Sequence, residues 1–134
     1  MEELVIEFHL NSRSGLSPYQ QLVQQVKHAL RLGLLKEGDR LPTVKEVARQ
    51  MAVNPNTVLK AYRELEHEGL VAARPGVGTF VTRTLADGTL AAQGPLRKDL
   101  QRWLTKARLA GLDDESIEAL FVNTFHNAAG EDVA

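Results

Sequence analysis

The segment LPTVKEVARQMAVNPNTVLKAYRELEHEGL, residues 41–70, contains two helix-start signals in close succession. Thr43 has Glu46 three residues later, which is the spacing of a capping box. Asn54 is a preferred N-cap residue, and Pro55 suits the first helical position. Apolar residues at helical spacing follow the first start: Val44, Val47, Ala48 and Met51. Two helices joined by a turn of three or four residues predict a helix-turn-helix.

The second of these helices, predicted from residue 54 to residue 68, has an apolar and a polar side. Four residues are spaced to face a core: Val58, Ala61, Tyr62 and Leu65. The polar side consists of Asn56, Lys60 and Arg63, with Thr57 beside it. Such side chains can bond base edges or phosphates, and the N-terminal residues of the second helix touch bases in helix-turn-helix docking. We interpret this helix as a recognition helix; the alternative is an ordinary solvent-exposed helix.

The residues before this segment predict a short strand, a helix and a turn. Residues 5–10 roughly alternate between apolar and polar and predict the strand. A cap at residues 17–18, with Gln20 as the capping-box partner, starts a helix that Gly33 ends. Residues 34–41 are then predicted to form a turn.

The residues after the recognition helix predict a β-hairpin wing. Residues 70–73 and 79–82 form its strands, with a tight turn between them. Arg74, Gly76 and Gly78 in that turn are candidate contacts to the minor groove or the DNA backbone, since glycine lets the main chain come close to phosphate. For the two glycines, the need to turn the hairpin is an equally good explanation.

Lys45 is a further candidate contact. It lies in the first turn of the first helix of the pair, where the helix N-terminus also favours an anion, and is placed to meet a phosphate. The alternative is an ordinary exposed lysine.

The remainder of the chain predicts a linker over residues 85–94 and two helices over residues 95–134. Both helices carry apolar stripes too large to leave in water, and the residues that we expect to form a dimer interface are Leu100, Trp103, Leu104, Ile117, Leu120, Phe121 and Phe125. A twofold dimer would match a palindromic operator. The alternative is that the helices fold back on the first domain, residues 1–84. Two helices cannot readily enclose a metabolite, and no residues single out a small-molecule effector.

Composition excludes several classes of function. The 134 residues include no cysteine, which excludes disulfides and thiolate metal sites and fits a reducing, cytoplasmic location. The four histidines are dispersed, so we expect no metal, no cofactor and no enzyme activity. No apolar run is long enough to span a membrane.

The net charge of −1 conceals an uneven distribution. Residues 18–84 hold ten basic and six acidic side chains, whereas residues 85–134 hold five basic and eight acidic ones. The predicted helix-turn-helix region is therefore the basic part of the chain, which favours an anionic partner.

The segments LPTVKEVA (41–48), VNPNTV (53–58), KAYRELE (60–66) and GVGTFV (76–81) resemble the GntR family of bacterial transcriptional regulators. The Asn-Pro-Asn-Thr-Val start is similar to the YtrA subfamily, and the resemblance covers residues 16–82. It implies a mainly α fold with a small β wing, that is, a winged helix-turn-helix followed here by a two-helix dimerisation segment. It also implies a homodimer that binds double-stranded operator DNA, usually as a repressor, and in this subfamily the regulated genes often encode ATP-driven membrane transporters.

The resemblance adds Thr43 and Asn54 to the candidate DNA-binding residues, beside Asn56, Thr57 and Lys60. This chain has Lys45 where the family commonly has arginine, and Asn54-Pro55 where it often has Ser-Arg. Lysine keeps a phosphate contact but lacks the bidentate fork of arginine. The missing arginine at Pro55 removes one expected base or phosphate contact, so we expect an operator that differs from that of family members that keep it. The alternative function is a winged helix that binds proteins and has no DNA target.

Overall fold

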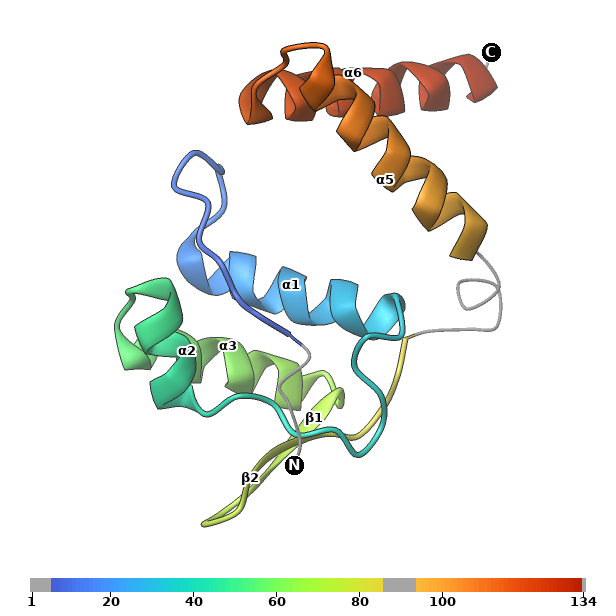
Figure 1. The fold of residues 1–134 in the computed structure, drawn as a ribbon. Coiled ribbons are helices and arrows are strands. Elements are labelled where there is room, and N and C mark those ends of the chain that lie inside the picture. Colours follow the sequence, from blue (N-terminus) through green and yellow to red (C-terminus); the bar gives the residue numbers. More distant parts are fainter. Residues whose placement is uncertain (1–5, 86–93, 134) are drawn as a thin grey trace. The chain divides into compact units, whose positions relative to one another are not determined.

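The computed structural model describes residues 6–85 and 94–133, which divide into two compact units on either side of the Ala92–Gln93 bond (Figure 1). The first unit contains α1 (Pro18–Arg31), α2 (Val44–Met51), α3 (Pro55–His67), β1 (Val71–Arg74) and β2 (Gly78–Val81). The second contains α5 (Gly94–Leu109) and α6 (Asp114–Val133). The predicted fold class, mainly helical with a small β wing, is confirmed.

The three predicted helix starts in the first unit are confirmed. In α1 and α2 the capping boxes are complete, since Ser17 pairs with Gln20 and Thr43 pairs with Glu46. In α3, Asn54 Oδ1 accepts a hydrogen bond of 2.8 Å from the backbone N–H of Asn56. These caps satisfy backbone donors that a helix cannot pair internally.

The core of the first unit lies between α3 and the two helices before it. The apolar side of α3 is buried as the periodicity predicts, through Val58, Ala61, Tyr62 and Leu65. These side chains join α1 and α2 residues in one cluster, among them Leu22, Val26, Leu30 and Val47. The hydroxyl of Tyr62 donates to the carbonyl oxygen of Pro42, and burial raises the pKa of that tyrosine far above its ordinary value. This bond ties the middle of α3 to the residue that precedes the cap of α2.

The wing contains a third paired segment that the sequence analysis did not predict. β1 and β2 pair in antiparallel fashion, with Val71 opposite Val81 and Arg74 opposite Gly78. Residues 38–41, expected only as part of a turn, lie along the other edge of β2. The Leu41 N–H donates to the Thr79 carbonyl oxygen, and the carbonyl oxygen of Asp39 accepts from the Val81 N–H, both at 2.8 Å. The wing is thus fastened to the segment that enters α2.

The predicted N-terminal strand is wrong over its described part, residues 6–10. Ile6 and Phe8 are buried, so the alternation of apolar and polar residues correctly predicts one buried side of this segment. The backbone, however, pairs with a side chain: the His9 N–H donates to Gln25 Oε1 at 3.2 Å, and Gln25 Nε2 donates to the His9 carbonyl oxygen at 2.7 Å. The segment is extended chain because an α1 glutamine, and not a neighbouring strand, meets its hydrogen-bonding groups.

In the second unit, α5 and α6 form a helical hairpin. Gly111, at φ 94°, lies in the connection, and Asp113 caps α6 by accepting a 2.9 Å hydrogen bond from the Ser116 N–H. Hydrogen bonding by the Ser116 side chain, and next by this backbone N–H, holds the pKa of Asp113 below its ordinary value. Ala107 and Ile117 are buried between the helices. Residues 86–93 of the predicted linker lie outside the described residues.

We expect Tyr62→Phe to lower the free energy of unfolding by about 1–3 kcal/mol, because it leaves the buried Pro42 carbonyl without its partner. Urea denaturation of purified protein measures the loss. Tyr19→Phe is the matched control, since Tyr19 is the other tyrosine and is half-buried at the surface. Equal stability of the two variants would contradict the assigned role of Tyr62.

Candidate DNA-binding site

The exposed side of α3 presents three of the predicted contact residues together. Asn56, Lys60 and Arg63 are exposed and lie opposite the buried stripe of the helix. Thr57 is half-buried at the edge of this surface. We refer to Asn56, Lys60 and Arg63 as the α3 face. Its amide and two cations suit base edges and phosphates.

The start of α2 provides a second part of the site. Lys45 is exposed in its first turn, as a phosphate contact requires. Thr43 Oγ1 accepts from the Glu46 N–H at 3.1 Å, and Glu46 Oε1 accepts from the Thr43 N–H at 3.0 Å. The pKa of Glu46 is lowered chiefly by that backbone hydrogen bond. The side-chain oxygens of Thr43 and Asn54 are therefore engaged in helix caps, which shape the site.

The wing provides the third part. The Arg74 guanidinium lies 4.8 Å from the centre of the Phe80 ring, a distance typical of a cation–π contact. Gly76, at φ 76°, lies in the three-residue loop between the strands. Gly78, at φ 145°, faces Arg40, whose Nε would lie 3.1 Å from a Cβ at that position. The positive φ favours glycine at residue 78, and a Cβ there would also require the Arg40 side chain to shift slightly.

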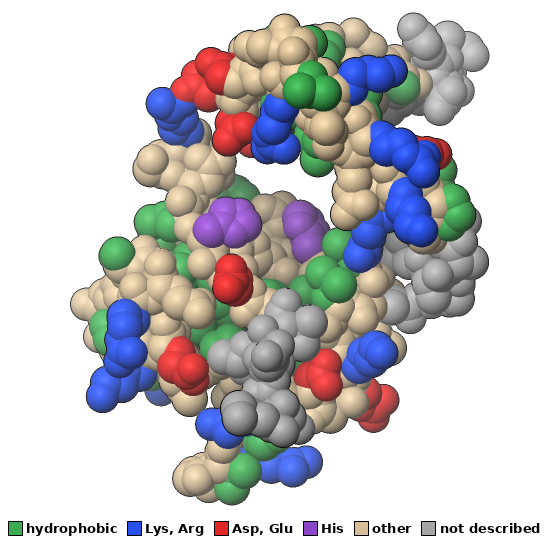
Figure 2. Space-filling view, in the orientation of Figure 1, with side chains coloured by type: hydrophobic (Ala, Val, Ile, Leu, Met, Phe, Trp, Pro, Cys, Tyr) green, Lys and Arg blue, Asp and Glu red, His purple; other side chains and the backbone are tan. Residues whose placement is uncertain are grey.

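Sequence reasoning missed two residues of this region, Arg40 and Tyr19. Arg40 lies in the segment paired with β2, and nothing in its local sequence separates it from a turn residue. Tyr19, in the first turn of α1, packs against the core, and its ring also contacts the ammonium of Lys60, 4.1 Å from the ring centre. Figure 2 shows Lys and Arg side chains around the wing and on the α2 side of the first unit.

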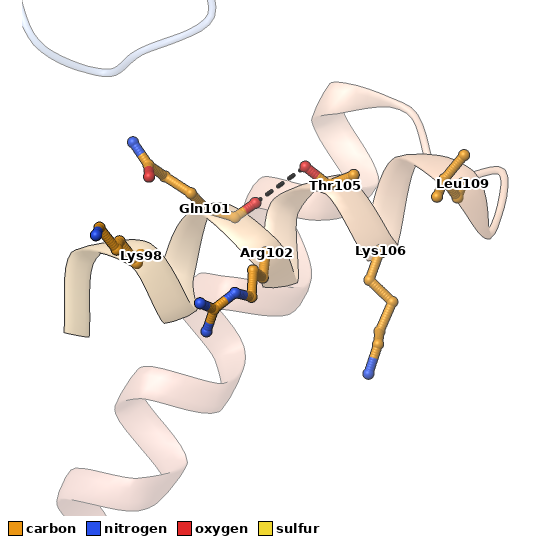
Figure 3. A pocket seen from close by; sticks show the side chains of 6 residues that line it. All are labelled: Lys98, Gln101, Arg102, Thr105, Lys106 and Leu109. Carbon is orange, nitrogen blue, oxygen red and sulfur yellow. Dashed lines mark hydrogen bonds between the residues drawn. The ribbon is translucent and has the colours of Figure 1, made fainter. Parts of the chain in front are cut away.

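The second unit has a basic and an apolar side. Although residues 85–134 are acidic in sum, α5 itself holds five basic residues and one acidic residue. Six of its side chains line an open hollow: Lys98, Gln101, Arg102, Thr105, Lys106 and Leu109 (Figure 3). Arg102 also pairs with Asp99 at 2.8 Å. Because one helix supplies all six, the hollow lacks the walls of an enclosed ligand cavity.

The predicted dimerisation residues fall into two groups. Ile117 is buried, and Trp103 and Leu104 are half-buried. Four others are exposed: Leu100, Leu120, Phe121 and Phe125. The two phenylalanine rings stack with centroids 6.2 Å apart. The α5–α6 hairpin therefore leaves these four apolar side chains uncovered by its own unit.

Two other structural features are absent from residues 6–85 and 94–133. No three His, Asp or Glu side chains gather there as they would around a metal ion. None of the described helices combines the length and the apolar character needed to cross a bilayer.

Comparison with known proteins identifies the family. Residues 18–81 match the bacterial regulatory proteins of the gntR family. The transcriptional repressor YtrA of Bacillus subtilis (strain 168) is 36% identical over 112 residues, which cover 81% of this chain and 84% of YtrA. The chain belongs to the GntR family. The predicted resemblance to YtrA is confirmed, and this GntR-family chain is a regulatory protein and not an enzyme.

Solved structures agree with the fold and with DNA as the partner. A transcriptional antiterminator from Listeria monocytogenes EGD-e matches with a TM-score of 0.56 and 32% identity, over 89% of this chain and 90% of that one. The DNA-binding domain of AraR, solved in complex with operator ORX1, matches with a TM-score of 0.50 and 27% identity, over 57% of this chain and 96% of that one. This chain is a winged-helix DNA-binding transcriptional regulator.

We expect Gly78→Ala to destabilise the first unit by about 1–3 kcal/mol, because alanine is strained at this φ and its Cβ would press on Arg40. Thermal denaturation measures the effect. Gly15→Ala is the control, since a Cβ there meets nothing within 4 Å. If both variants melt together, the packing of Arg40 on Gly78 does not matter to the wing.

Proposed function

We propose that this chain is a homodimeric repressor that reads operator DNA with the α3 face. The observation that carries the proposal is the exposure of Asn56, Lys60 and Arg63 together on the helix that follows the turn. Asn56 and Thr57 lie in the first turn of α3, the part that touches bases in this class of motif. The names of two relatives support the proposal, since YtrA is a repressor and AraR was solved on an operator.

The other candidate residues are assigned to the DNA backbone. Lys45 lies beside the α2 N-terminus, where the unpaired N–H groups favour phosphate. Arg74, with Arg40 nearby in the wing, supplies positive charge along the hairpin. Backbone contacts of this kind set the register of the protein on the duplex, whereas the α3 face supplies base discrimination.

The proposed dimer uses the exposed apolar surface of the α5–α6 hairpin. The second unit leaves four large apolar side chains exposed, Leu100, Leu120, Phe121 and Phe125, and burying them in an interface is more favourable than leaving them in water. The same surface of a second copy of the chain can bury these side chains without another partner. Twofold symmetry of such a dimer presents two α3 faces to a palindromic operator. We further propose that the operon encodes a membrane transporter, on the strength of the YtrA resemblance.

We expect Lys60→Ala to weaken binding to a duplex from the promoter of its own gene by about 1–3 kcal/mol if the lysine reads a base. Fluorescence anisotropy at several salt concentrations measures both the affinity and its salt dependence, which phosphate contacts make steep. Lys27→Ala is the control, because Lys27 is paired with Glu68 at 2.8 Å near the other end of α3. Undiminished binding by Lys60→Ala would remove the lysine from the site. Absence of any salt-dependent binding by the wild type would contradict the proposal that the chain reads an operator in this promoter.

We expect Phe125→Glu to convert a dimer into a monomer, because a buried unpaired carboxylate at the interface is costly. Sedimentation should then give the 14.8 kDa chain mass in place of twice that value. Leu109→Glu is the matched control: Leu109 is more exposed, at 84% against 62% for Phe125, but lies on the basic side of α5. A wild-type monomer at micromolar concentration would contradict the proposed dimer.

A further inference from the structure

The first turn of α1 meets α3 at a cluster of three polar side chains, Tyr19, Lys60 and Glu64. The Lys60 ammonium lies over the face of the Tyr19 ring, 4.1 Å from its centre. The Glu64 carboxylate, as a hydrogen-bond acceptor and then as a negative charge, raises the pKa of the Tyr19 hydroxyl above its ordinary value. One side chain of α1 therefore engages both charged residues of this part of α3.

Without Tyr19, the two α3 residues would be expected to engage each other. Lys60 and Glu64 stand four positions apart on one helix, a spacing at which opposite charges attract. Both belong to the described part of the chain, and no ion pair joins them there, whereas Lys27 pairs with Glu68 at 2.8 Å. The ring thus replaces the carboxylate as the neighbour of the ammonium.

A ring in place of a carboxylate beside the Lys60 ammonium leaves more positive charge for an anionic ligand. An ammonium paired with a carboxylate presents little net charge, and DNA has to compete with the carboxylate for it. An ammonium over an aromatic ring keeps its full charge and its N–H donors, and its flexible stem is held in one place. Glu64, whose carboxylate acts on the tyrosine hydroxyl, makes no ion pair with the lysine in the described part of the chain.

We infer that Tyr19 is a positioning residue for DNA recognition, which holds Lys60 ready for DNA and keeps Glu64 from neutralising it. The inference rests on the proposed function of the α3 face. It assigns to α1 a part in operator binding that does not require the tyrosine to touch DNA.

The test is a set of variants measured by anisotropy on the same promoter duplex. Tyr19→Leu should weaken binding about two- to fivefold, because it removes the ring and frees Glu64. Tyr19→Phe should fall between this variant and the wild type, since it keeps the ring but frees the carboxylate. Glu64→Gln alone should bind as tightly as the wild type or tighter, because glutamine can still accept from the tyrosine hydroxyl. Combined with Tyr19→Leu, it should recover much of the lost affinity.

A background variant separates positioning from other roles. In Lys60→Ala protein, Tyr19→Leu should cost no further affinity, because the lysine that it positions is gone. An equal loss in both backgrounds, or no recovery by Glu64→Gln, would overturn the inference and leave Tyr19 as a packing residue or a direct contact. Thermal denaturation of each variant shows whether the fold is intact. If the wild type binds the duplex and Lys60→Ala weakens it, the proposed function stands whatever Tyr19 does.

Discussion

The packing of one side of α3 against α1 and α2 is the interaction on which the rest of the structure depends. Val58, Ala61 and Leu65 are fully excluded from solvent there. Burying an aliphatic side chain of the size of Val58 or Leu65 stabilises a fold by about 1.5–3 kcal/mol, so this contact dominates the orientation of the helix. The bond from Tyr62 to Pro42 then sets where α2 begins relative to α3. Because the apolar side is held inward, the polar side of α3 faces outward in one defined direction.

The other parts of the DNA-binding site follow from this arrangement. The helix caps satisfy the backbone at the start of α2 and α3, which leaves Lys45 and Asn56 exposed in the first turns. The pairing of residues 38–41 with β2 joins the wing to the entry of α2. Short-range hydrogen bonds and one edge pairing therefore hold α2, α3 and the wing as a single surface, which is what simultaneous contact with bases and backbone requires.

The second unit shows the opposite balance between burial and exposure. Between α5 and α6 only Ala107 and Ile117 are buried among the described side chains, whereas Phe121 and Phe125 stack in the open. A hairpin with so small a core gains little stability by itself, and its uncovered apolar surface is the reason for proposing a second copy. The basic side of α5 also shows that the net acidic charge of residues 85–134 does not describe each helix, because α5 alone is basic.

Local sequence was enough to determine the helix starts, the apolar side of α3, the hairpin and the family. A helix cap joins residues about three positions apart, and helical periodicity is visible over one or two turns. Such signals, for example Thr43 with Glu46, can therefore be predicted from the sequence alone. Only the tertiary structure decided the contacts between distant segments. It paired Gln25 with His9 in place of a strand, laid residues 38–41 along β2, and set Tyr19 under Lys60. In each case the partner is chosen by how the helices pack, and the chemistry of either residue alone is equally compatible with solvent.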